Sequence, residues 1–478
     1  MKISLIQPRW RIETDSLSDP LSLGYLASYL KSSGYKDIKI HSAVFDSDKK
    51  MISYTSNADV VGMTATSSMM PHVNILVDNI KKRTPRTIIV LGGVHPSALP
   101  EDVLKNRNID YVVRGEGEIT FYELIEAINS NKDVDNIAGI SYRKNNIICH
   151  NRNRTLVENI DILPFPDRRL MIQESYIRRY YNVWNKRAVA VLGSRGCYYN
   201  CSPCASEVVW SGKWRARSPL NVVEEIEQLV KDYRVNEIHF EDANFALDKQ
   251  RVIDLCSLLI KRKFKISWNC LIYPNGLDKD TLKVMKYAGC KTIGIGIESG
   301  SYQILKEYGK FNVDIKKAKD IFNISKKLNI NRIAFVVLGL PSETRITIQQ
   351  TKDLLLEIQP DYMTCSMLTP FPGTKYYKIA KEKGYINNDF DWSKLYYTRP
   401  YMPTNNLTKR ELYDEYKKLL KELDYSWRRR ALNFWPLYYK LKVEFINSLP
   451  REYLFLIYRL FRHVKLLVFN RLYKIINL

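Results

Sequence analysis

Residues 193–204 read Gly-Ser-Arg-Gly-Cys-Tyr-Tyr-Asn-Cys-Ser-Pro-Cys, which places Cys197, Cys201 and Cys204 within eight residues. The stretch follows Ala-Val-Ala-Val at 188–191, an apolar run typical of a buried strand. Three thiolates in one loop can occupy three corners of a cubane iron–sulfur cluster and leave the fourth iron without a protein ligand. Such an open iron is a place where a substrate binds and is reduced.

A zinc site is the alternative for these cysteines. Structural zinc favours a fourth Cys or His close in the sequence, and none occurs between Cys204 and His239. We therefore favour the 4Fe-4S cluster. The remaining cysteines have no metal-like spacing and are expected to be buried structural residues: Cys149, Cys256, Cys270, Cys290 and Cys365.

The cysteine loop lies in a region, residues 186–400, where strand-like and helix-like patterns alternate six times. Helical patterns include 222–233, 251–262, 281–288 and 347–356. Six such units predict a partial, TIM-like (β/α)6 barrel with its chemistry at the carboxyl ends of the strands. The strands are expected near Val189, Ile238, Ile266, Ile293, Phe335 and Met363.

Residues 1–135 show the same alternation with runs that are apolar throughout. Such runs, separated by helices, predict an α/β domain with a doubly wound, Rossmann-like parallel sheet covered on both faces. A ligand is expected at the carboxyl ends of its strands. The predicted strands are 3–6, 38–40, 60–64, 88–91 and 111–113, and the clearest helices are 21–31 and 73–82.

Three polar or glycine-rich turns follow these strands, at 62–68, 92–96 and 114–118. Glycine permits close approach of the backbone to a ligand, although a single glycine after a strand is also common turn chemistry. Three such turns at successive strand ends predict a ligand cleft.

Residues 136–185 change character and are interpreted as the connection between the two domains. They contain a hairpin-like segment, 139–149, around Asn145–Asn146, and a proline-bearing segment, 163–167. Beyond the barrel, residues 401–478 are expected to form a helical, basic C-terminal region.

Residues 427–478 carry eleven Lys and Arg against two Glu, a local balance of 11 − 2 = +9, interleaved with aromatic and aliphatic residues. A basic amphipathic helix of this kind can lie in an anionic membrane interface, which would suit a lipid-like substrate. It can equally cap the barrel with its apolar face. Nucleic-acid binding is not expected, since no recognition motif occurs.

The whole chain of 478 residues has a formal net charge of +23, which favours an anionic partner. Its few cysteines fit a reducing compartment. The first residues lack the features of a signal peptide, and no uncharged apolar run is long enough to span a membrane. We therefore expect a cytoplasmic protein with a possible peripheral membrane contact.

The Cys-x3-Cys-x2-Cys pattern after the first strand of a six-unit barrel resembles the radical S-adenosylmethionine superfamily. The resemblance implies that Cys197, Cys201 and Cys204 hold the cluster and that S-adenosylmethionine binds the open iron. An electron from an external donor then cleaves its carbon–sulfur bond. Pro203 stands where the family usually has an aromatic residue that packs on the adenine.

Three later barrel segments also resemble the family and imply contacts with S-adenosylmethionine. Glu241 or Asp242 would receive the methionine ammonium group, Glu298 would face the ribose hydroxyls, and the turn at Gly339 would lie beside the adenine. The segment 370–374 matches the turn after the sixth strand.

The turns at 92–95 and 114–118 resemble those of the cobalamin-binding radical enzymes, over about residues 1–400. The Asp-x-His-x-x-Gly motif that supplies a histidine to cobalt in other cobalamin proteins is absent. His95 is therefore not assigned as a cobalt ligand, and a capping or turn role is at least as favoured. The candidate cobalamin contacts are Thr64, Gly92, Gly93, His95, Gly115 and Glu116.

Several residues flank the cluster loop without a decisive pattern. The aromatic side chains are expected to pack and exclude solvent rather than to line a substrate cavity. Arg215 and Arg217, as lone charges, are expected in solvent. The aromatic residues are Tyr198, Tyr199, Trp210 and Trp214.

The resemblance implies a C-methyltransferase that acts on an unactivated carbon of a small-molecule or lipid-like substrate. The alternative keeps both cofactors but catalyses a cyclisation, ring rearrangement or oxidation without net methyl transfer. A binding or sensor protein that has kept the fold is a third interpretation, and the intact cysteine triplet argues against it. No catalytic residue beyond the cofactor contacts is assigned.

Overall fold

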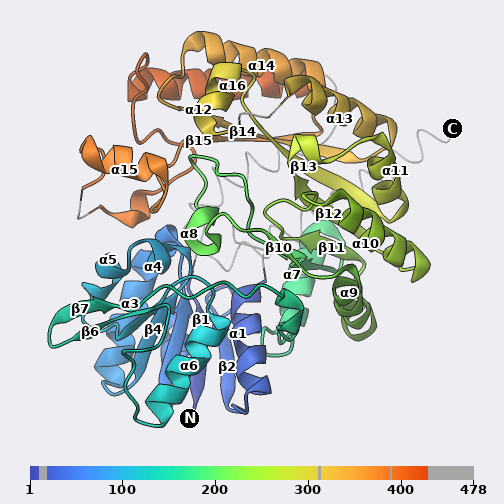
Figure 1. Ribbon diagram of the computed structural model, residues 1–478. Coiled ribbons are helices and arrows are strands. Elements are labelled where there is room, and N and C mark those ends of the chain that lie inside the picture. The colour runs from blue at the N-terminus through green and yellow to red at the C-terminus, as the bar shows by residue number, and fades with distance from the viewer. Residues whose placement is uncertain (10–18, 311–313, 388–389, 429–478) are drawn as a thin grey trace. The chain divides into compact units, whose positions relative to one another are not determined.

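The computed structural model describes residues 1–9, 19–310, 314–387 and 390–428 (Figure 1). By its internal contacts the chain separates into Met1–Lys417 and Lys418–Leu478. The last described helix is α16 (Lys409–Arg428). The basic segment 427–478 therefore lies almost wholly outside the described residues. Within the described ranges, no helix is both long and apolar enough to cross a membrane.

The first sheet is built from five parallel strands in the order β2-β1-β3-β4-β5. Helices α1 and α6 pack on one face, and α3 and α5 pack on the other (Figure 1). This is the predicted doubly wound arrangement. The elements are β1 (Ile3–Gln7), α1 (Leu21–Ser32), β2 (Ile38–Ser42), α2 (Asp48–Tyr54), β3 (Val60–Thr64), η1 (Ser67–Met69), α3 (Met70–Arg83), β4 (Ile88–Gly92), α4 (Val94–Ala98), α5 (Pro100–Leu104), β5 (Tyr111–Val113) and α6 (Glu118–Asn129).

A hairpin of β6 (Ile140–Lys144) and β7 (Ile147–His150) extends this sheet to seven strands, because β6 pairs antiparallel with β5. Its turn residues, Asn145 and Asn146, both have positive φ, as a tight two-residue hairpin turn requires. The hairpin that we assigned to the interdomain connection is thus part of the first sheet. The connection continues through η2 (Ile160–Ile162) and α7 (Gln173–Trp184), and the domain boundaries themselves stay predictions.

The second sheet has six parallel strands in the order in which they follow one another in the chain, with β8 and β15 at its two edges. Helices cover its outer face (Figure 1), which confirms the partial barrel. Its elements are β8 (Ala188–Val191), α9 (Pro219–Tyr233), β11 (Glu237–Phe240), α10 (Lys249–Lys261), β12 (Ser267–Ile272), η3 (Pro274–Gly276), α11 (Lys279–Tyr287), β13 (Cys290–Glu298), α12 (Tyr302–Tyr308), α13 (Ile315–Lys327), β14 (Asn331–Leu338), α14 (Arg345–Ile358), β15 (Tyr362–Met367), α15 (Lys375–Glu382) and η4 (Trp392–Lys394).

The strands of this barrel bury one face and leave the other partly open. In β14, for example, Ala334, Val336 and Leu338 are buried, whereas Phe335 and Val337 remain partly exposed. Because successive strand side chains point to opposite faces, the helices cover one set and the other set lines the barrel interior. The cluster loop begins at the carboxyl end of β8, where it forms β9 (Ser194–Arg195), α8 (Ser206–Trp210) and, after α8, β10 (Arg215–Ala216).

Candidate active site

The three cysteines lie in the loop that follows β8 at the mouth of the barrel. The backbone N–H of Ser202 donates to the carbonyl of Tyr308 at 2.8 Å, which ties the loop to α12. The N–H of Cys204 donates to the carbonyl of Cys201 at 2.9 Å, and the N–H of Ser206 donates to Sγ of Cys204 at 3.4 Å. Backbone donors to sulfur are among the contacts by which proteins tune iron–sulfur clusters.

The surroundings of the three thiols act on their pKa values in two directions. Burial raises the pKa of all three, that of Cys201 to about 12, and the nearby Lys310 ammonium acts in the opposite direction. A coordinated thiol is deprotonated by the metal itself, so this high pKa does not oppose ligation. Within the described ranges, no group of three His, Cys, Asp or Glu side chains is arranged to bind a single metal ion. A cubane cluster does not need such a group, because each thiolate binds a different iron.

Asp242 binds groups of the protein itself, and its contact with S-adenosylmethionine stays a prediction. It is fully buried, and its two oxygens accept from the N–H of Gly193 at 2.7 Å and from the hydroxyl of Ser194 at 2.6 Å. Arg251 adds a hydrogen bond from Nη2 to the carbonyl of Gly193 at 2.6 Å. These contacts assign Asp242 to holding the start of the cluster loop. The other acidic candidate, Glu241, is exposed and lines a small hollow of about 80 Å³, and its contact with the ligand likewise stays a prediction.

Glu298 lies at the end of β13 in a buried setting with φ of 56°. Its Oε1 accepts from Nζ of Lys310 at 2.8 Å, and the same ammonium donates to the carbonyl of Gly296 at 2.7 Å. The rings of Tyr273 and Tyr308 lie 5.0 and 5.6 Å from that ammonium. Lys310 was missed by the sequence analysis, because nothing in its local pattern marks a lysine that will be buried. The ribose contact of Glu298 stays a prediction.

The turn at Gly339 is closed by Glu343. Gly339 has φ of 95°, a backbone conformation that favours glycine, and a Cβ there would lie 3.0 Å from the end of the Leu412 side chain. Its N–H donates to Oε2 of Glu343 at 3.2 Å, and the hydroxyl of Thr347 donates to Oε1. Burial raises the pKa of Glu343 from 4.5 to about 7, although both donors lower it.

The raised pKa of Glu343 predicts a pH-dependent stability. Because the folded pKa lies above the unfolded value of 4.5, the contribution of Glu343 is fully present below about pH 4.5 and is lost as the pH rises through about 7. The variant Glu343→Gln should therefore gain stability relative to the wild type between about pH 5 and 8. Urea unfolding of both metal-free proteins across this range measures the difference. A difference that stays constant with pH would contradict the prediction.

The turns of the first sheet come together at one edge, as predicted. Thr64 and Gly92 are register partners at the ends of β3 and β4, and the N–H of Ala65 donates to the carbonyl of Gly92 at 2.9 Å. A Cβ on Gly93 would lie 2.8 Å from the carbonyl oxygen of Ala65, so packing requires this glycine. Gly115 has φ of 74° and open space where its Cβ would stand, which leaves backbone accessible to a large ligand.

His95 lies behind this edge in an enclosed position. The ring is 1% exposed, its Nδ1 lies 2.9 Å from the hydroxyl oxygen of Ser67, and the Trp392 ring packs against it edge-on. Burial lowers the pKa of His95 to about 4, which keeps the ring neutral. The ring is thus held by its neighbours in the protein, and a contact of His95 with cobalamin stays a prediction.

Arginines from the cluster loop bind both carboxylate oxygens of Glu116, and its contact with cobalamin stays a prediction. Oε1 accepts from Nη1 of Arg195 at 2.9 Å, and Oε2 accepts from Nη1 of Arg215 at 2.9 Å. Arg195 also donates to Glu118 at 2.7 Å, and its guanidinium lies 5.2 Å from the centre of the Tyr25 ring. We name Glu116, Glu118, Arg195 and Arg215 the interdomain ion cluster. Its side chains are at most 9% exposed.

The expectation that Arg215 and Arg217 are solvated is wrong. Arg215 belongs to the interdomain ion cluster, and Arg217 pairs with the buried Glu225, which also binds Arg168 at 2.6 Å. The isolated cysteines behave as expected in four cases, since Cys256, Cys270, Cys290 and Cys365 are buried and Cys149 is partly exposed.

Comparison with known proteins gives two family matches on this chain. The B12 binding domain matches residues 12–125, and the radical SAM superfamily matches residues 191–355. The uncharacterized methyltransferase PH0819 of Pyrococcus horikoshii is 32% identical over 84% of this chain and 86% of its own length. The anaerobic magnesium-protoporphyrin IX monomethyl ester cyclase of Cereibacter sphaeroides is 26% identical over 87% of this chain and 69% of its own.

The fold is also that of a solved structure. The radical S-adenosylmethionine methyltransferase TsrM from Kitasatospora setae, solved with cobalamin and a [4Fe-4S] cluster bound, superposes with a TM-score of 0.68 and 18% identity. The match covers 80% of this chain and 75% of that one. Its two domain matches and its 32% identity to PH0819 show that the chain belongs to the cobalamin-binding radical S-adenosylmethionine enzymes. Its cofactors are a 4Fe-4S cluster, S-adenosylmethionine and cobalamin.

Proposed function

We propose that this enzyme methylates an unactivated carbon of a small-molecule substrate, with S-adenosylmethionine as the source of the methyl group. The proposal rests mainly on the ion pair between Arg195, two residues before Cys197, and Glu116, which lies in the turn after strand β5 of the first sheet. It holds the cluster loop against the domain that matches B12 binding proteins, so both cofactors can serve one substrate. When bound, cobalamin carries a methyl group, and S-adenosylmethionine at the cluster supplies a hydrogen-abstracting radical.

The chain's own residues would act in binding and orientation. We propose that Cys197, Cys201 and Cys204 bind the cluster and that Glu241 and Glu298 contact S-adenosylmethionine. Asp242 fixes the loop that carries the cysteines. The partly open inner face of the barrel, lined in part by Phe335 and Val337, would exclude water around an apolar portion of the substrate.

The second candidate function is a cyclisation, ring rearrangement or oxidation that uses both cofactors without net methyl transfer. The 26% identity to a cyclase supports this candidate. The two are separated by their products. The reconstituted enzyme would be incubated with S-adenosylmethionine bearing a deuterated methyl group, a reductant and fractionated small molecules from cells that lack the enzyme. Methyl transfer predicts S-adenosylhomocysteine together with a deuterium-labelled product. Formation of only 5′-deoxyadenosine and methionine, with a changed but unlabelled substrate, would overturn methyl transfer in favour of the alternative.

A further inference from the structure

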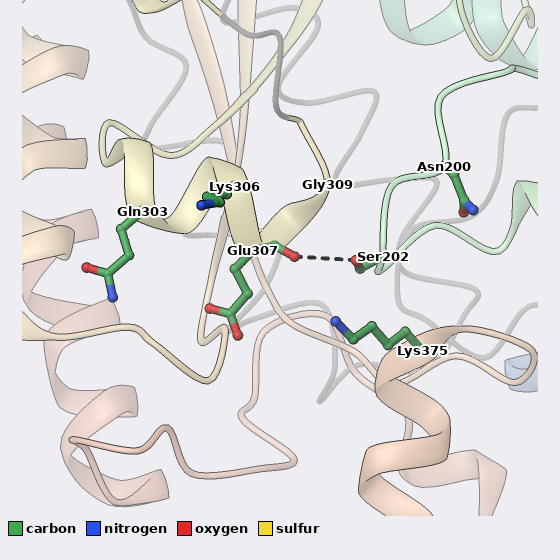
Figure 2. A pocket seen from close by; sticks show the side chains of 7 residues that line it. All are labelled: Asn200, Ser202, Gln303, Lys306, Glu307, Gly309 and Lys375. Atoms are coloured by element: carbon green, nitrogen blue, oxygen red, sulfur yellow. Dashed lines mark hydrogen bonds between the residues drawn. The ribbon is translucent and has the colours of Figure 1, made fainter.

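A hollow of about 390 Å³ lies against the cluster loop (Figure 2). Its lining includes Asn200 and Ser202 of the loop, Lys306 and Gly309 at the end of α12, and Lys375 at the start of α15. Figure 2 shows the Lys375 side chain extending from α15 toward the contact between Ser202 and Glu307.

The wall of this hollow is formed by the backbone that carries Cys201. A Cβ on Gly309 would lie 2.9 Å from the carbonyl oxygen of Asn200 and 3.4 Å from Cα of Cys201. The hydroxyl of Ser202 donates to the carbonyl of Glu307 at 3.3 Å. A molecule seated in the hollow would therefore rest on the segment that holds a cluster ligand.

The charges around the hollow are mainly positive. Lys306 and Lys375 are exposed, and α15 continues with the exposed Lys378 and Lys381 opposite its buried Tyr376. We name these four lysines the lysine face. None of them forms an ion pair with another described residue. The only acidic lining residue, Glu307, accepts from the N–H of Ser342 at 3.0 Å.

We propose that the lysine face and its hollow dock an acidic, low-potential electron-carrier protein that reduces the enzyme. This inference rests on the proposed function, which needs an electron from another molecule. In the docked complex the carrier gives up one electron to the cluster, and no bond is made or broken at that step. The electron is then consumed in cleaving the carbon–sulfur bond of S-adenosylmethionine.

A protein partner fits better than a small anion, because the positive charge is spread rather than convergent. Lys375 and Lys381 are six helical positions apart, which corresponds to about 9 Å along the helix axis. Spread, exposed charge steers an oppositely charged protein and fixes its orientation. The formal net charge of +23 on the whole chain would also attract an acidic protein.

Charge reversal on the reconstituted holoenzyme tests the proposal. In Lys306→Glu/Lys375→Glu, the affinity for fluorescently labelled, oxidised flavodoxin, measured by anisotropy at low salt, should fall by about 10-fold or more. The matched control is Lys326→Glu/Lys327→Glu. These lysines are also exposed and lie in the last turn of α13, which leads to the amino end of β14 at the other end of the barrel. The control should retain the wild-type affinity and its weakening by salt.

Equal losses of affinity in the two variants would show that only the net charge of the enzyme matters. Unchanged affinity in both variants would show that the carrier binds elsewhere. Either result would overturn the proposal. Dithionite bypasses docking, so with dithionite the lysine-face variant should release 5′-deoxyadenosine from S-adenosylmethionine at the wild-type rate. Failure of the wild type itself with dithionite would count against the proposed function, whereas the binding comparison would still decide the docking surface.

Discussion

Replacing Cys201 with alanine is expected to abolish cleavage of S-adenosylmethionine while leaving the protein folded. A cubane held by three thiolates loses one anchor, and no other described cysteine replaces it, since Cys256, Cys270, Cys290 and Cys365 are buried and Cys149 lies in the first sheet. Iron and sulfide content after anaerobic reconstitution, together with 5′-deoxyadenosine formed under dithionite, measures the effect. Circular dichroism establishes that the fold remains.

The matched control is Cys256→Ala, which removes a buried thiol from α10. It should cost a modest amount of stability, about 1 kcal/mol, as expected for deleting one small buried group. Its iron content and cleavage activity should equal those of the wild type. If Cys201→Ala kept its cleavage activity, the assignment of the cluster to this loop would be wrong.

The second large effect is expected from Glu116→Gln in the interdomain ion cluster. The substitution preserves shape but removes the charge that faces two buried arginines. Breaking a buried ion pair on one side typically costs about 3–5 kcal/mol, because the remaining charge is left without compensation. We expect the loss of stability to lie near the lower end of this range. Arg195 retains its ion pair with Glu118, and Arg215 retains its hydrogen bond to the carbonyl of Val157.

Urea unfolding followed by fluorescence measures this loss, and Glu227→Gln provides the comparison. Glu227 pairs with Arg262 at 2.7 Å, but both side chains are more than a third exposed, so its loss should cost less than about 1 kcal/mol. Equal effects of the two substitutions would show that the interdomain ion cluster contributes no more than a surface pair.

The strands and the cysteine loop could be predicted from the sequence because their signals are local. Runs such as residues 88–91 are apolar throughout. The alternation of such runs with amphipathic helices predicts both the doubly wound sheet and the sheet of the partial barrel. The cysteine triplet is equally local, since its ligands lie within one loop. The turns at Thr64, Gly92 and Gly115 could be placed at the same edge of the sheet, because the strands before them are parallel.

The roles of individual charged residues could not be predicted, because their partners are distant in the chain. Glu116 and Arg195 are 79 residues apart, and Asp242 lies 49 residues from Gly193. The local sequence around an acidic residue after a strand is the same whether its carboxylate binds a ligand or pairs with another residue of the protein. The hairpin of β6 and β7 was misplaced for the same reason, since only its pairing with β5 shows where it belongs.

Binding of both cofactors is tested most directly by anaerobic reconstitution of the full chain with iron, sulfide and hydroxocobalamin, followed by reduction in the presence of S-adenosylmethionine. Cobalamin bound per chain and 5′-deoxyadenosine released would be quantified together. We expect one cobalamin per chain and formation of 5′-deoxyadenosine that depends on the cluster. Reconstituted protein that binds no cobalamin and releases no 5′-deoxyadenosine would contradict this expectation.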